Sequence, residues 1–112
     1  MRVAISGALR TGLVAATMLA AGSVAQAKDA RCYTTDDDYF DCDFVATDRK
    51  GSFEISAPDM PTYSLIVDEP GIASGFVNLG GRNVSLPGRY HRSSDDAACW
   101  DNDETGSQIC AW

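Results

Sequence analysis

The chain has 112 residues, with nine Lys and Arg, sixteen Asp and Glu, and a formal net charge of −7. This acidic balance excludes a nucleic-acid binder held by phosphate contacts, because such proteins need a basic surface. The length fits one domain, and no apolar run after residue 27 approaches the roughly 20 residues that a membrane span needs.

The first segment of the chain has the pattern of an export signal. Arg2 and Arg10 supply positive charge, an apolar stretch follows them, and residues 25–27 form an Ala-x-Ala cleavage site. We therefore predict a signal peptide over residues 1–27 and one disulfide-stabilised β domain over residues 28–112. That domain keeps all sixteen acidic residues and seven of the nine basic ones, so its net charge is −9. Export predicts a periplasmic or secreted protein.

All four cysteines follow the cleavage site, as a disulfide framework in an oxidising compartment requires. Three pairings are open to Cys32, Cys42, Cys99 and Cys110. A hairpin that turns at residues 103–106 would set Cys99 directly opposite Cys110. This register favours Cys32 with Cys42 and Cys99 with Cys110, and pairing of the N-terminal with the C-terminal cysteines is the alternative.

Short segments in which apolar and polar residues alternate, separated by turn residues, predict an all-β domain. The clearest strand is 39–46, whose residues Phe40, Cys42, Phe44 and Ala46 are expected to face the core. Further strands are predicted over residues 52–57, 63–68, 74–79, 82–86 and 89–92, with a terminal hairpin over 99–112. The Gly80-Gly81 pair is expected to form a two-residue hairpin link. A small antiparallel barrel or sandwich of seven or eight strands follows, because one open sheet would leave its edges and an apolar face uncovered.

Two acidic segments are weak candidates for calcium sites. The first supplies carboxylates close together, and Ca²⁺ takes six to eight oxygen ligands. Its residues are Asp36, Asp37, Asp38 and Asp41, with Asp43 close behind. The second, residues 101–106, opens like an EF-hand loop but has Trp112 where the bidentate glutamate belongs. A solvated loop and a β-turn are the favoured interpretations, and no cofactor is predicted.

His91 is the only histidine, and general acid–base catalysis needs a partner to orient such a group. With Glu54 and an arginine it could form the constellation of a small exported ribonuclease, but no second histidine exists to act as the other acid or base. A non-enzymatic protein is therefore favoured, with a ribonuclease-like hydrolase that uses His91 as an alternative. The arginines that follow residue 80 could bind an anionic ligand, but pairing with the surplus carboxylates is favoured; they are Arg82, Arg89 and Arg92.

Four aromatic residues sit beside the cysteines and are candidates for partner binding: Tyr33, Tyr39, Trp100 and Trp112. Tyrosine and tryptophan carry much of the energy of protein interfaces. They also cover disulfides in small domains, which is the structural interpretation of the same residues.

A small exported β domain without a catalytic constellation is best interpreted as a binding or envelope-associated protein. Its charge of −9 favours a cationic protein partner. The layout is loosely similar to the periplasmic inhibitors of C-type lysozyme, with Tyr39 three residues ahead of Cys42, the segment 71–76, and Trp100 with a cysteine near the end. This resemblance implies a small exported β-barrel directed at a strongly basic enzyme. Inhibition of a basic envelope-directed hydrolase, such as a C-type lysozyme, is therefore the alternative function.

Overall fold

The computed structural model describes residues 26–112, so nearly all of the predicted signal peptide lies outside the described residues. The described chain is all-β, as predicted, and contains no helix that is long and apolar enough to cross a membrane. Its strands are β1 (Lys28–Thr34), β2 (Asp38–Ala46), β3 (Phe53–Ser56), β4 (Thr62–Glu69), β5 (Ile72–Asn78), β6 (Asn83–Ser85), β7 (Tyr90–Arg92), β8 (Cys99–Asn102) and β9 (Gln108–Ala111).

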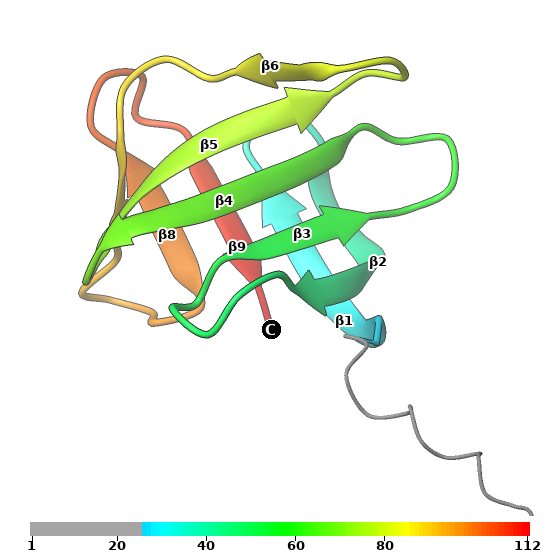
Figure 1. Cartoon of the computed structure of the whole chain (residues 1–112), viewed down its shortest axis with the longest axis horizontal. Helices are drawn as coiled ribbons and strands as arrows, with labels where there is room; N and C mark the ends of the chain where they lie inside the picture. The colour runs from blue at the N-terminus through cyan, green and yellow to red at the C-terminus, as the bar shows by residue number, and fades with distance from the viewer. Residues whose placement is uncertain (1–25) are drawn as a thin grey trace, which may run out of the picture.

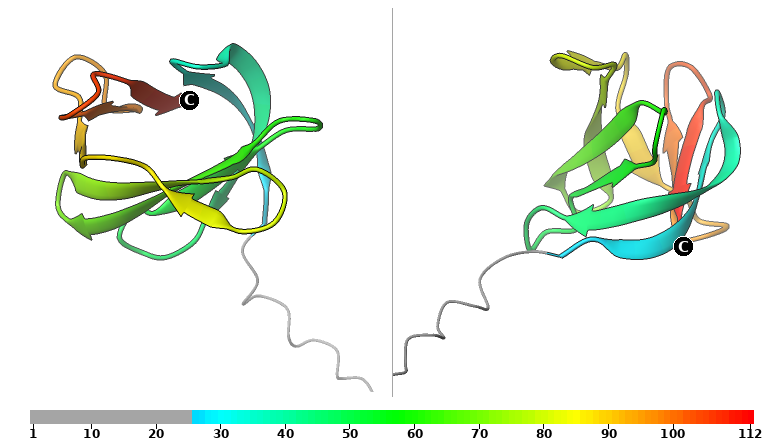
Figure 2. Two further views of the ribbon diagram at one scale, coloured as in Figure 1. Left: turned by 90° about the horizontal axis from the view of Figure 1, so that it is seen from above. Right: turned by 90° about the vertical axis from the view of Figure 1, so that its right-hand side faces the viewer.

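Eight of these strands close into an antiparallel barrel, and β6 is an additional strand (Figure 1). The order around the barrel is β4-β3-β2-β1-β9-β8-β7-β5, and pairing of β4 with β5 closes it. The first part of β5 pairs with β7 and its last part pairs with β6, so β6 continues the sheet where β7 ends. The views in Figure 2 show the strands surrounding a common centre, which the core side chains fill.

The barrel interior is lined by side chains from alternate strand positions. Its largest fully buried side chains include Trp100, Ile55 and Leu65. Phe40 and Phe44 pack against this core, as predicted, whereas Ala46 is exposed. Ala46 is the last residue of β2, at the end of the barrel, where a small side chain is not covered.

Both disulfides have the favoured pairing. Cys32–Cys42 joins β1 to β2 inside the core cluster. Cys99–Cys110 joins residues directly opposite each other on β8 and β9, one position away from the inward-facing pair of Trp100 and Ile109. The second bridge therefore lies on the outer side of the wall, although both of its cysteines are buried. Two intramolecular disulfides are typical of a protein outside the reducing cytoplasm.

Two local features differ from the sequence prediction. β1 was not among the predicted strands, because its inward-facing residues are small or polar and give no apolar alternation; they are Ala30, Cys32 and Thr34. The link between β5 and β6 has four residues, since Asn78 and Asn83 form its last strand pair. The side-chain oxygen of Asn78 accepts hydrogen bonds from the amides of Gly80 and Gly81, which holds this wider turn.

Candidate functional site

The outer face of the β1–β2 hairpin carries an ordered series of three cross-strand pairs. Cys32 and Cys42 point into the core, so the residues on either side of each of them point outward. In order along the strands, the outward pairs are Tyr33 with Tyr39, Arg31 with Asp41, and Asp29 with Asp43. One face of two strands thus runs from aromatic to acidic.

The aromatic end of this face includes a third ring from the segment that follows β9. The ring centroids of Tyr33 and Tyr39 are 4.9 Å apart, and those of Tyr39 and Trp112 are 6.0 Å apart with nearly parallel planes. Tyr39 is 58% exposed and Trp112 is 48% exposed. We call Tyr33, Tyr39 and Trp112 the aromatic cluster. Tyr33 is also the strand partner of Cys110, so the interpretation that aromatics cover the disulfides fits this ring.

Trp112 is held in place by both its backbone and its side chain. Its backbone exchanges two hydrogen bonds with the backbone of Arg31. Its indole N–H donates to a carboxylate oxygen of Asp96 at 3.0 Å. The amide of Ala98 and then this indole lower the pKa of Asp96, because both donate to the charged form. An exposed tryptophan is therefore fixed in one orientation.

Arg31 occupies the middle of the face. Its guanidinium lies 5.9 Å from the centroid of the Tyr39 ring and forms an ion pair with Asp41 at 3.0 Å. Both side chains of the pair are largely exposed, so the pair itself contributes little stability. The Tyr39 ring therefore already accepts a cation.

The acidic end of the face brings like charges together. Asp29 and Asp43 are directly opposite each other, and both are exposed. With Asp41 they line one surface groove, whose other side includes Ser56 and Pro58. Like charges directly opposite each other on a sheet repel and destabilise it. Neither Asp29 nor Asp43 forms an ion pair within residues 26–112, whereas Asp41 pairs with Arg31.

Trp100 does not belong to this surface, which corrects its selection as a partner-binding residue. It is 1% exposed and is opposite Ile109 in the core. The guanidinium of Arg92 lies 4.3 Å from its ring centroid and covers it. Trp100 is opposite the inward-facing Ile109, whereas Trp112 is three residues beyond Ile109 and pairs with Arg31, so one ring fills the barrel and the other faces out.

Asp37, Asp38 and Asp41 of the first calcium candidate contact different partners. A carboxylate oxygen of Asp37 accepts hydrogen bonds from the hydroxyls of Thr34 and Tyr63. Asp38 accepts from the amide of Tyr39, and Asp41 pairs with Arg31. Within residues 26–112 no three or more His, Cys, Asp or Glu side chains are placed to hold a metal ion together.

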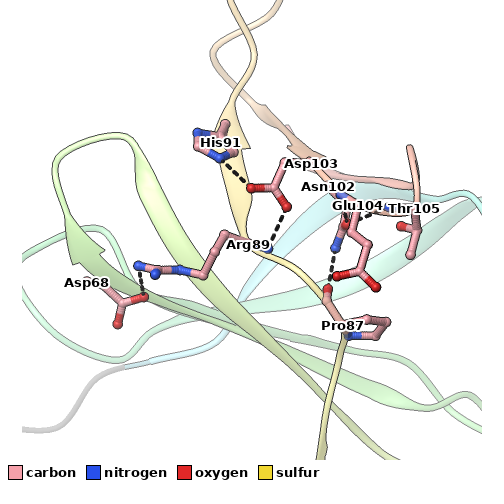
Figure 3. A network of polar contacts seen from close by, with 8 residues as sticks. All are labelled: Asp68, Pro87, Arg89, His91, Asn102, Asp103, Glu104 and Thr105. Carbon is pink, nitrogen blue, oxygen red and sulfur yellow. Dashed lines mark hydrogen bonds and ion pairs between the residues drawn. The ribbon is translucent and has the colours of Figure 1, made fainter.

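His91 lies in a polar network that joins the segment between β6 and β7 to the turn after β8 (Figure 3). Its Nε2 is 3.0 Å from one carboxylate oxygen of Asp103, whose other oxygen accepts from the amide of Arg89. That amide and then His91 lower the pKa of Asp103. The guanidinium of Arg89 pairs with Asp68, as predicted. Arg82 and Arg92 form no ion pair within residues 26–112, and Arg92 lies over the Trp100 ring instead.

Asn102 forms the second half of the network. Its side-chain amide donates to the carbonyl of Pro87, and its oxygen accepts from the amides of Glu104 and Thr105. The segment 101–106 is therefore a hydrogen-bonded β-turn. Glu54 faces outward on β3, which is separated from β7 by β4 and β5. The structure does not bring Glu54 to His91, and the ribonuclease-like constellation is not assembled.

Sequence reasoning selected Tyr33, Tyr39 and Trp112 for partner binding, named Asp43 only beside the first calcium candidate, and did not select Asp29 or Arg31. Only the register of β1 on β2 brings Asp29, Arg31 and Asp43 onto one face. The pattern that could have revealed them is the alternation of charged residues around Cys32 and Cys42. Comparison of the chain with protein-family models, with curated proteins and with solved structures finds no match. The functional argument therefore rests on the surface chemistry.

Proposed function

We propose that the protein is an exported, non-enzymatic binding protein whose partner is a cationic protein. One observation carries the proposal: of the sixteen carboxylate side chains in the described residues, none is buried and fourteen are exposed. Only three carboxylates take part in ion pairs within residues 26–112: Asp41, Asp68 and Asp103. The surface therefore carries a large uncompensated negative charge, which speeds encounter with basic proteins and disfavours acidic ones.

A periplasmic or secreted location is part of the same proposal. The two disulfides support it because they persist in oxidising compartments. The start of β1 at Lys28, directly after the predicted cleavage site, also supports it. Strand pairing would then begin with the first residue of the mature chain.

The test measures binding of the oxidised mature chain to a panel of purified basic proteins that includes a C-type lysozyme. We expect binding in about 50 mM NaCl that weakens steeply towards about 500 mM, because salt screens charges on exposed surfaces. The control is the same basic proteins after succinylation, which inverts their charge. Absence of binding at low salt, or binding that succinylation does not abolish, would overturn the proposal.

Inhibition of a basic envelope-directed hydrolase is the second candidate function. The observation that favours it is the closed, disulfide-stabilised barrel, the architecture that the resemblance to the lysozyme inhibitors implied. The test is cell-wall lysis by a C-type lysozyme in the presence of equimolar mature chain. Loss of lysis supports inhibition, and binding with full lysis supports the first function alone.

A further inference from the structure

We infer that the docking surface for this cationic partner is the outer face of the β1–β2 hairpin together with Trp112. The inference rests on the proposed function and specifies where the partner binds. Its occupant is a protein surface that presents two lysine or arginine side chains, one for the aromatic cluster and one for the Asp29–Asp43 pair.

The aromatic cluster supplies a preorganised contact area. Tyr39 and Trp112 are stacked and about half exposed, and Trp112 is fixed by Arg31 and Asp96. Fixed aromatic side chains lose little conformational freedom on binding, and tyrosine and tryptophan are enriched among residues that dominate interface energies. No such group of exposed stacked rings is found elsewhere among residues 26–112.

Arg31 provides an internal example of the expected contact. Its guanidinium lies over the Tyr39 ring while it pairs with Asp41. Cations are attracted to the faces of tyrosine and, more strongly, tryptophan rings. A partner's lysine or arginine above Trp112, with Asp96 at the edge of the indole, would repeat this combination of ring and carboxylate.

The Asp29–Asp43 pair is the proposed site for the partner's second basic side chain. Asp29 and Asp43 are opposite each other without a basic side chain between them, and they share a groove with Asp41. A bound ammonium or guanidinium group would relieve their repulsion, so this end gains more from a cation than a single exposed carboxylate would.

The spacing of the two ends defines the partner. The pairs Tyr33–Tyr39 and Asp29–Asp43 are four residues apart along each strand. At about 3.3 Å per residue, this is about 13 Å. Trp112 pairs with Arg31, two residues from Asp29 along β1, so a cation above Trp112 is nearer to the acidic pair than Tyr33 and Tyr39 are. The partner must therefore present two basic side chains no more than about 13 Å apart, a separation that positions two to four residues apart on an extended segment satisfy.

The experiment compares variants of the mature chain for binding to the basic protein of the panel that the wild type binds most tightly. We expect D29N/D43N to weaken binding about tenfold, and Y39S and W112S to weaken it about tenfold to thirtyfold each. The matched control is E54Q/E69Q, which removes two charges from exposed positions on β3 and β4 and should weaken binding less than threefold.

Thermal melts and fluorescence separate docking from damage to the fold. D29N/D43N should melt no lower than the wild type, because it removes a like-charge pair. Trp112 is half exposed and Trp100 is buried, so a neutral quencher reaches mainly Trp112, and partner binding should protect it. Equal weakening by D29N/D43N and E54Q/E69Q, or unchanged quenching on binding, would overturn this surface and leave the proposed function standing. Absence of wild-type binding would overturn both.

Discussion

Substitution of Gly75 by alanine tests how the barrel is closed between β5 and β7. These strands share only two registered pairs, Ile72 with His91 and Ala73 with Tyr90. An ideal Cβ on Gly75 would lie 2.5 Å from Cε1 of Tyr90 and 3.2 Å from Cδ1 of Leu86. Ordinary carbon contacts are about 3.5–4.0 Å, so the Tyr90 ring would have to withdraw by about 1 Å.

That withdrawal is costly because Tyr90 is buried in the core. We expect Gly75→Ala to lower the free energy of unfolding by about 2–3 kcal/mol, the usual range for an overpacked site. For a domain of this size the melting temperature should fall by about 10–20 °C. Thermal and urea unfolding of the oxidised mature chain, followed by circular dichroism, measures both quantities.

The matched control is Gly81→Ala, where a Cβ meets open space and the backbone φ is not positive. It should change the free energy of unfolding by less than about 0.5 kcal/mol. The double variant Gly75→Ala/Tyr90→Leu should lose less free energy of unfolding than the two single variants lose in sum, because Tyr90→Leu removes the clashing ring. A Gly75→Ala protein that melts within about 2 °C of the wild type would refute the assignment of Gly75 as the packing site of Tyr90.

Three further predictions concern one disulfide bridge and two titrating groups. Replacing Cys99 and Cys110 by alanine should cost about 2.5–3 kcal/mol of stability, measured by urea unfolding, since the bridge closes a loop with a sequence separation of 11. The pKa of Asp103 is lowered in the folded protein, so the stabilisation by its carboxylate is full above the ordinary pKa and is lost as pH falls through the folded value. The wild type should therefore have a higher free energy of unfolding than Asp103→Asn at pH 7, and the two values should converge in strong acid. Burial and then Asp37 raise the pKa of Tyr63, so its stabilisation is full below pH about 10 and is lost at higher pH. Tyr63→Phe should therefore lose less stability than the wild type between about pH 9 and about pH 11, and its absorbance titration should lack the latest-ionising tyrosine.

The terminal hairpin shows what the sequence could predict. Polar turn residues at 103–106 fix the register, and that register alone sets Cys99 opposite Cys110 and Trp100 opposite Ile109. The all-β class and the disulfide pairing followed from such local patterns. The closed barrel was one of two predicted arrangements, because strand order depends on contacts between distant segments.

The candidate surface was only partly predictable for the same reason. Trp100 and Trp112 both lie beside a cysteine and look alike in the sequence, and only their parity relative to Ile109 separates core from surface. Asp29 was not selected, and Asp43 was named only beside the first calcium candidate, because β1 lacks apolar alternation and no strand indicated that the two residues face each other. Their pairing needs the register of a strand that the pattern did not reveal.

The position of β1 between β2 and β9 has a consequence for how the protein is assembled. The β1–β9 seam joins residues 32–34 to residues 109–111, whereas the β1–β2 and β8–β9 hairpins each need only local contacts. Because loop closure costs more entropy for longer separations, the hairpins can form early and the seam must form late. In the export proposed above, the first strand would then wait with one unpaired edge until almost the whole domain had been translocated. The charged residues on β1, Lys28, Asp29 and Arg31, would keep that waiting edge from pairing with other chains.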